Sequence, residues 1–106
     1  MEGFVVWCRS SDEIEEILNY LRGNKCKDVF GNDFKIISRN LAYKEDVGFR
    51  ISRKSTGWVF FGYDTIGLYT KEEIGIISYN DFYNSYINAD AGDFEKSNYS
   101  VEYLLE

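Results

Sequence analysis

The segment that decides the fold is Val47–Gly62, which reads VGFRISRKSTGWVFFG. Its first part, residues 47–53, alternates apolar and polar side chains, the pattern of a strand with one buried face. Residues 54–57 (KSTG) have the composition of a turn. The run WVFF at 58–61 is apolar throughout, which predicts a strand buried on both faces. Two such strands joined by a short turn predict an antiparallel hairpin.

The neighbouring segments extend this hairpin into a sheet. A turn at 31–33 (GND) leads into FKIISR at 34–39, which we expect to be a third strand of an antiparallel meander. The N-terminal run GFVVWCR at 3–9 is rich in β-branched and aromatic residues and predicts a further strand. The tail at 99–105 has the composition of an edge strand or of a disordered end. The sheet should therefore contain four or five strands.

Two helices are expected beside this sheet. Ser10 and Glu13 have capping-box spacing, and apolar residues then recur at helical intervals until Gly23, which is placed to end the helix in a left-handed conformation. A shorter helix should begin at Ser78, with Asp81 in its first turn. The predicted fold is thus α+β: an antiparallel sheet of about four to five strands, with an N-terminal helix and one later short helix packed on it.

Length and charge limit the class of protein. The chain has 106 residues with no internal repeat and no linker, which predicts one domain over 1–106. Its net charge is −6, from 18 acidic and 12 basic residues, and no basic stripe interrupts it. Nucleic-acid binding needs such a stripe to displace counterions, so we expect no nucleic-acid partner.

Localisation follows from the N-terminus and the cysteines. No stretch approaches the ~20 apolar residues of a membrane span, and Met1–Arg9 lacks the basic start of a signal peptide. We therefore expect a cytoplasmic protein with no membrane partner. Cys8 and Cys26 should then be reduced thiols that act as small core residues, although export without a signal would permit a disulfide.

Catalysis is not expected, and neither a cofactor nor a metal is implied. The chain has no histidine, which removes the commonest general base and metal ligand. It also lacks a glycine-rich phosphate loop. Carboxylate pairs exist at Glu72–Glu73 and at Asp90 with Asp93, but solvated loop charge explains them better than hydrolysis does. Asp90, Asp93 and Glu95 together also lack the ligand pattern of an EF-hand.

Several short motifs follow one another in a distinctive order. They are ISR at 37–39, VG at 47–48, S-x-GW-x-FF at 55–61 and IGLY at 66–69. This order resembles a bacterial family, the immunity-protein-thirty-three-like family, over more than half of the chain, from Ser38 to about Glu95. The chain departs from the family where Tyr63–Thr65 replaces a longer glutamate-rich insert and where Tyr79–Asp81 lacks a proline.

The resemblance implies an immunity protein that neutralises a cognate toxin by stoichiometric binding. The chain itself is expected to be a monomer or a small homo-oligomer. Acidic side chains would complement a basic active-site cleft of the toxin, and tyrosines would anchor the complex. The candidate partner-binding residues are Asp90, Asp93, Glu95, Tyr79, Tyr83, Tyr86, Glu72 and Glu73.

Other functions fit the same composition. A phage-encoded anti-defence protein that blocks a basic nucleic-acid-binding channel would also be small, acidic and without catalytic residues. A small enzyme that uses carboxylates alone and a structural subunit of a larger complex rank below it.

Overall fold

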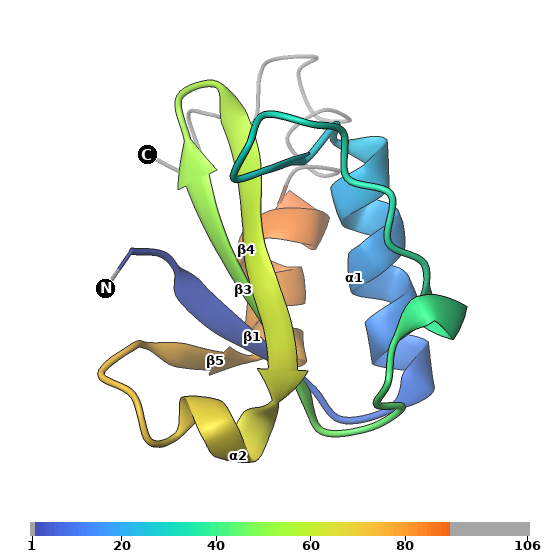
Figure 1. Cartoon of the computed structure of the whole chain (residues 1–106), viewed down its shortest axis with the longest axis vertical. Coiled ribbons are helices and arrows are strands. Elements are labelled where there is room, and N and C mark those ends of the chain that lie inside the picture. Colours follow the sequence, from blue (N-terminus) through green and yellow to red (C-terminus); the bar gives the residue numbers. More distant parts are fainter. Residues whose placement is uncertain (1, 90–106) are drawn as a thin grey trace.

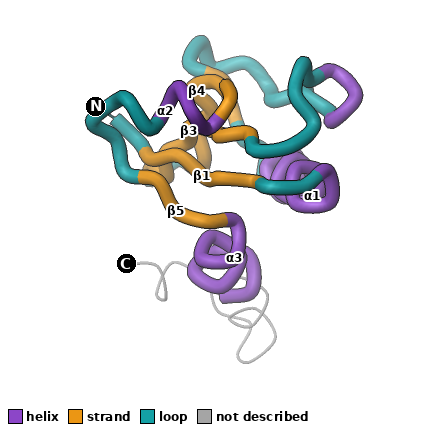
Figure 2. The backbone as a smooth tube through the Cα atoms, turned by 90° about the horizontal axis from the view of Figure 1, so that it is seen from below, coloured by secondary structure: helices purple, strands orange, loops and turns teal. Residues whose placement is uncertain are grey.

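A computed structural model of the protein describes residues 2–89 (Figure 1). Within these residues the chain forms a five-stranded sheet and three α-helices, which confirms the predicted α+β class. Figure 2 shows helices α1 and α3 as two separate coils beside the strands. The acidic loop expected at 90–98 and the tail strand expected at 99–105 lie outside the described residues.

The first strand and the first helix form where the sequence predicts them. Strand β1 spans Phe4–Cys8, and helix α1 spans Ser11–Gly23. The Ser10 hydroxyl accepts a hydrogen bond from the Glu13 amide at 3.3 Å, and the Glu13 carboxylate accepts one from the Arg9 amide at 2.9 Å. The second bond therefore joins the helix start to the residue that follows β1, one position before the cap.

The end of α1 differs from the prediction, because Gly23 stays helical and Lys25 takes the left-handed conformation, with a φ of 56°. The Lys25 amide donates to the Arg22 carbonyl at 3.2 Å, and the Cys26 amide donates to the Leu21 carbonyl at 3.0 Å. This pair of bonds is a Schellman motif. It turns the chain so that Cys26 enters the core, and it places the left-handed residue two positions after Gly23.

The predicted hairpin is present. Strands β3 (Val47–Lys54) and β4 (Gly57–Thr65) pair antiparallel, with a register shift next to Ile51. On β3 the residues Val47, Phe49 and Ile51 are 0% exposed, which confirms the alternation seen in the sequence.

The WVFF run is buried on one face only, so the prediction of burial on both faces is wrong. Trp58 and Phe60 are 3% and 8% exposed, whereas Val59 and Phe61 are half-buried. The core lies on the face that carries Trp58, and on the other face the Arg50 guanidinium stacks over the Phe61 ring at 4.8 Å.

The sheet is mixed, not purely antiparallel as predicted. Its strand order is β2-β4-β3-β1-β5, where β2 is Lys27–Asp28 and β5 is Ile76–Ser78. Strand β2 runs parallel to β4, and β5 runs parallel to β1. The reason is that α1 carries the chain back across the sheet, so that β2 starts at the same end as β1. The segment after β4 returns the chain to that end in the same way before β5 begins.

The expected strand at 34–39 does not form, so the three-strand meander is reduced to the hairpin. Residues 34–37 are irregular and lead into a 3₁₀ turn, η1 (Ser38–Asn40). Phe34 is buried against Phe60, with ring centroids 4.9 Å apart. Arg22 Nη1 donates to the Ile36 carbonyl at 2.7 Å. Phe34 is thus buried, and Ile36 partly buried, without strand pairing of the backbone.

The remaining helices are short. Helix α2 spans Ile66–Tyr69, α3 spans Tyr79–Phe82, and a π-helix, η2, continues from Tyr83 to Ile87. The Ser78 hydroxyl accepts a hydrogen bond from the Asp81 amide at 3.1 Å, which confirms the predicted cap of the later short helix.

Helix α2 packs on the sheet face opposite α1 and α3, where it approaches β3 closely at Gly48. A Cβ added at Gly48 would lie 2.6 Å from the Tyr69 ring and 2.8 Å from a Val5 methyl group. Only glycine fits at this point of β3. Two of the motifs in the family resemblance, VG at 47–48 and IGLY at 66–69, therefore contact each other in the structure.

Five aromatic residues from different elements form one group in the core, which we call the aromatic cluster: Phe4, Tyr20, Trp58, Phe82 and Tyr86. The Phe82 centroid lies 5.7 Å from those of Trp58 and Tyr20, and 5.1 Å from that of Tyr86. The Trp58 indole donates to the Tyr20 hydroxyl at 3.3 Å. The cluster therefore joins α1, the hairpin and α3.

Cys8 and Cys26 are free thiols and are 0% and 1% exposed, so both are core residues as predicted. Among the helices of residues 2–89, none is long and apolar enough to cross a membrane.

Candidate binding surface

The predicted partner-binding tyrosines differ in their exposure. Tyr79 is 7% exposed, and its hydroxyl donates to a Glu16 carboxylate oxygen at 2.6 Å. Burial, together with this hydrogen bond, raises the pKa of Tyr79. Both the ring and the hydroxyl of Tyr79 are thus engaged inside the fold, where they connect α3 to α1.

The two tyrosines of η2 point to different environments. Tyr86 belongs to the aromatic cluster, with its centroid 5.2 Å from that of Trp58. Tyr83 is 38% exposed and lies 6.3 Å from Tyr79 between ring centroids. Of the three predicted tyrosines, Tyr83 therefore offers the most surface to a partner.

The predicted acidic residues are only partly within the described chain. Glu72 and Glu73 are exposed in the loop between α2 and β5, and the Glu72 amide donates to the Tyr69 carbonyl at 3.0 Å. This loop and Tyr79 lie at opposite ends of β5. Asp90, Asp93 and Glu95 fall outside residues 2–89.

A different surface, which the sequence did not single out, lies in the loop after β2. The Asp28 carboxylate accepts hydrogen bonds from the amides of Phe30 at 2.8 Å and Asn32 at 2.9 Å. The Asp28 amide donates to the Asn32 carbonyl at 2.8 Å, and its carbonyl accepts from the Gly31 amide at 3.0 Å. Gly31 has a φ of 84°, which a side chain would oppose. These bonds fix the loop in one conformation.

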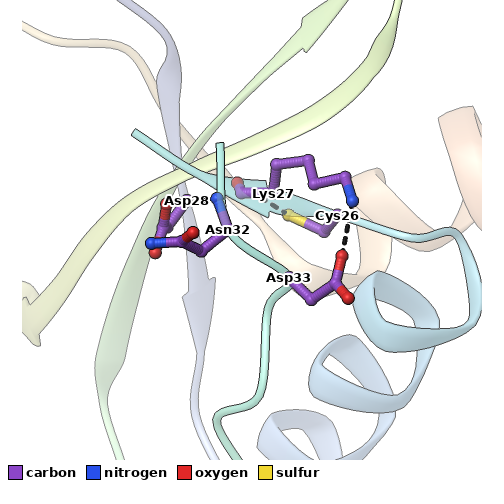
Figure 3. Close-up of polar contacts among 5 residues, drawn as sticks. All are labelled: Cys26, Lys27, Asp28, Asn32 and Asp33. Atoms are coloured by element: carbon purple, nitrogen blue, oxygen red, sulfur yellow. Dashed lines mark hydrogen bonds and ion pairs between the residues drawn. The ribbon is translucent and has the colours of Figure 1, made fainter. Parts of the chain in front are cut away.

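The base of this loop is closed by an ion pair. Lys27 and Asp33 form an antiparallel bridge, and the Lys27 ammonium group reaches the Asp33 carboxylate (Figure 3). This hydrogen bond lowers the pKa of Asp33. The segment from β2 to Asp33 therefore behaves as a small hairpin whose two arms are tied together.

The tip of the loop presents apolar side chains to solvent. Val29 is 53% exposed and Phe30 is 85% exposed, the highest value among the large hydrophobic residues of the described chain. We call Val29 and Phe30 the apolar tip. Scattered hydrophobic residues are ordinary on a protein surface, whereas contiguous exposed apolar patches mark interaction sites, so the apolar tip is a candidate contact surface.

An apolar groove lies beside the apolar tip, with a volume of about 290 Å³. It runs between the loop and β4, and its apolar walls are Val29, Phe30, Phe34, Ile36, Phe60 and Phe61. Figure 1 shows that the segment carrying β2 crosses over one end of β4, which brings the loop and the strand together. The surface thus combines a projecting aromatic ring with an adjacent recess.

A second recess, with a volume of about 570 Å³, opens on the other side of the loop base. We call it the basic pocket, because its charged walls are four cations and a single carboxylate: Arg22, Lys25, Lys27, Lys35 and Asp33. Asp33, Phe34 and Lys35 line both recesses. The apolar groove and the basic pocket are therefore two sides of one continuous surface.

The chemistry of this surface is suited to binding. Cys26 lines the basic pocket, but burial raises its pKa to about 11, so the thiol stays protonated and unreactive at neutral pH. Its Sγ donates to the Lys27 carbonyl at 3.6 Å. Within the part of the chain that the structure describes, no group of three or more acidic or cysteine side chains is placed to hold a metal ion.

Comparison with known proteins yields no relative. No protein-family model matches the chain, and neither a curated protein nor a solved structure matches it. The resemblance of the sequence motifs therefore stays a prediction.

Proposed function

We propose that the protein is an immunity protein that neutralises a bacterial toxin by binding it in a stoichiometric complex in the cytoplasm. The observation that carries the proposal is the apolar tip: Val29 and Phe30 are exposed, yet the loop that holds them is fixed by the Asp28 hydrogen bonds. Leaving a phenylalanine side chain in water forgoes about 2 kcal/mol of burial free energy, which a docking partner would recover.

Preorganisation strengthens this interpretation. A flexible loop loses conformational entropy on binding, whereas a loop that is already fixed loses less. Aromatic anchors in fixed positions commonly carry most of the binding free energy of a protein–protein interface. The apolar groove next to Phe30 adds a recess that a side chain of the toxin would fill.

The sequence resemblance supports the biological context of the proposal. The motifs between Ile37 and Tyr69 resemble the immunity family. A protein that inhibits a toxin by binding it needs no catalytic residues of its own. The buried, protonated Cys26 and the lack of histidine agree with a binding role.

Growth rescue tests the proposal. Toxin domains encoded in the source genome would be expressed one at a time in a host bacterium, with and without this chain. We expect one domain to stop growth alone but not when the chain is present. That domain and the chain should then co-elute as an equimolar complex in size-exclusion chromatography. If the chain rescues growth from none of the domains and forms no complex, the proposal is wrong.

A further inference from the structure

We infer that the partner presents an apolar pocket with an acidic rim, which docks on the apolar tip and the basic pocket beside it. This inference rests on the proposed function, since it names the surface and the partner chemistry of the same binding event. It differs from the expectation of a basic toxin cleft, which came from the family resemblance and from the acidic candidates at 72–73 and 90–95. The charged walls of the two recesses are four cations against two carboxylates, Asp28 and Asp33, so the local charge of this surface has the opposite sign.

The basic pocket differs in charge from the chain as a whole. The chain as a whole has a net charge of −6, yet this pocket gathers four cations against one carboxylate. Lys27 is paired with Asp33, and Arg22 holds the Ile36 carbonyl. Lys25 and Lys35 are exposed residues of the pocket wall, and the charge of Lys35 also contributes to the lowered pKa of Asp33. Carboxylates of a partner are the natural complement to such a pair.

The position of Lys25 follows from the helix end. The Schellman motif places Lys25 immediately after α1, where the carbonyl ends of the helix carry partial negative charge. A cation is favoured there, and the left-handed φ of 56° directs the following residue, Cys26, into the core. The local fold therefore keeps Lys25 at the pocket wall independently of any partner.

The two halves of the surface are joined through Asp33, Phe34 and Lys35, which line both recesses. A partner that covers Phe30 must therefore also approach Lys35. Its surface has to be apolar opposite the ring and acidic opposite Lys25 and Lys35. A partner with a basic rim would receive the ring but would place like charges against the lysines, which opposes association.

The first experiment measures the surface without a toxin. The full chain, isotopically labelled, would be titrated with two capped peptides, EEWLEE and KKWLKK, and amide shifts would be followed by NMR. We expect the acidic peptide to shift amides of residues 25–36 and the basic peptide to leave them unchanged. The K25E/K35E variant should lose this response, and adding salt should weaken it. Equal shifts from both peptides, or shifts confined to other residues, would overturn the inference.

The second experiment uses the toxin domain found by growth rescue. Phe30→Ala should weaken binding by about thirtyfold or more, as expected for an interface anchor. Leu68→Ala is the matched control, because Leu68 is also an exposed apolar residue, at 46%, but lies on α2. It should leave affinity unchanged. K25E/K35E should slow association about tenfold at low salt, with a smaller effect at high salt.

These measurements separate the two proposals. If the wild-type chain rescues growth and Phe30→Ala binds the toxin as tightly as wild type, the immunity function stands and the inference about the surface is wrong. If the wild type rescues no growth, the function is wrong, and the peptide titration still decides whether the surface selects acidic, apolar ligands. A dimer of wild type that Phe30→Ala converts to a monomer would assign the tip to self-association and overturn the inference.

Discussion

Phe82 and Phe30 are opposite extremes of aromatic burial in this fold, at 0% and 85% exposed. Phe82 contacts rings from β1, α1, the hairpin and η2 in the aromatic cluster. Phe30 stands at the end of a loop whose hydrogen bonds are made by the backbone and the Asp28 carboxylate. One ring is held by its side-chain contacts, and the other is held in place by the chain that carries it.

This difference indicates how stability and binding are divided. The aromatic cluster joins elements that are distant in sequence, so its loss should affect the whole fold. The apolar tip is fixed by contacts within Lys27–Asp33, so its side chains are free to change without unfolding the protein. Variants in the aromatic cluster should therefore change the free energy of unfolding, whereas variants of the apolar tip should change the affinity for a partner.

The largest effect is expected from Phe82→Ala. Removing a fully buried phenylalanine leaves a cavity and should lower the free energy of unfolding by about 3–5 kcal/mol. Urea denaturation followed by tryptophan fluorescence would measure it, with Phe82→Leu as a milder variant if the alanine variant does not fold. Phe30→Ala, in contrast, should stay within about 0.5 kcal/mol of wild type. A larger loss for Phe30→Ala than for Phe82→Ala would reverse the comparison.

Gly48→Ala should be next in size. The added methyl group would meet the Tyr69 ring at 2.6 Å and Val5 at 2.8 Å, so the packed face must move apart. We expect a loss of about 1–3 kcal/mol, measured by the same denaturation. Gly67→Ala is the matched control on α2, because its new Cβ would meet nothing within 4 Å. Equal stability of the two variants would show that α2 is not packed tightly on β3.

Asp28→Ala tests whether the loop is fixed as described. The variant removes the acceptor for the Phe30 and Asn32 amides, so these amides should exchange with solvent faster, and stability should fall by about 1 kcal/mol. Hydrogen exchange followed by NMR would measure this. Asp28→Asn keeps an acceptor oxygen and should retain most of the protection. Unchanged exchange in Asp28→Ala would mean that the carboxylate does not hold the tip.

The smallest effect concerns pH. The bond from Lys27 lowers the pKa of Asp33 in the folded state, while the unfolded value is about 3.9. A lowered pKa contributes stability that is present above the unfolded value and is lost as the pH falls through the folded one. The advantage of wild type over Asp33→Asn in urea should therefore shrink on acidification. Because Asp33 is exposed, the difference should be slight and should also decrease with added salt. A difference that grows at low pH would contradict the ion pair.

Local signals predicted the elements that local interactions determine. The cap at Ser10 and the apolar spacing that follows specify α1 without reference to the rest of the chain. The alternation in β3 likewise specifies a one-sided strand. The turn at 31–33 was also expected, and Gly31 does adopt a positive φ of 84° there.

Elements set by distant pairing were not predicted. Lys27–Asp28 has no strand composition and becomes β2 only because β4 lies beside it. FKIISR at 34–39 has strand composition but packs Phe34 and Ile36 against the core from an irregular backbone. Pairing partners far away in sequence leave no local pattern, so neither the parallel pairs nor the strand order could be deduced.

The candidate surface was missed for a related reason. Val29 and Phe30 look like core residues in a sequence, and their position directly before Gly31 and Asn32 was the available sign that they belong to a turn. Conversely, Tyr79 and Tyr86 look suited to an interface but lie at helical spacing with Phe82 and are packed with the core. Composition alone does not distinguish an aromatic residue that is buried from one that is displayed.

The place of β1 in the sheet has a consequence for how the protein is made. β1 is synthesised first but lies between β3 and β5, so Val5 pairs with Arg50 on one side and with Ile76 on the other. While the chain is being translated, both edges of β1 stay unpaired until β3 and β5 have been synthesised. Folding that depends on such distant contacts is slow, and unpaired edges favour aggregation. We therefore expect the sheet to be completed only after translation has passed β5.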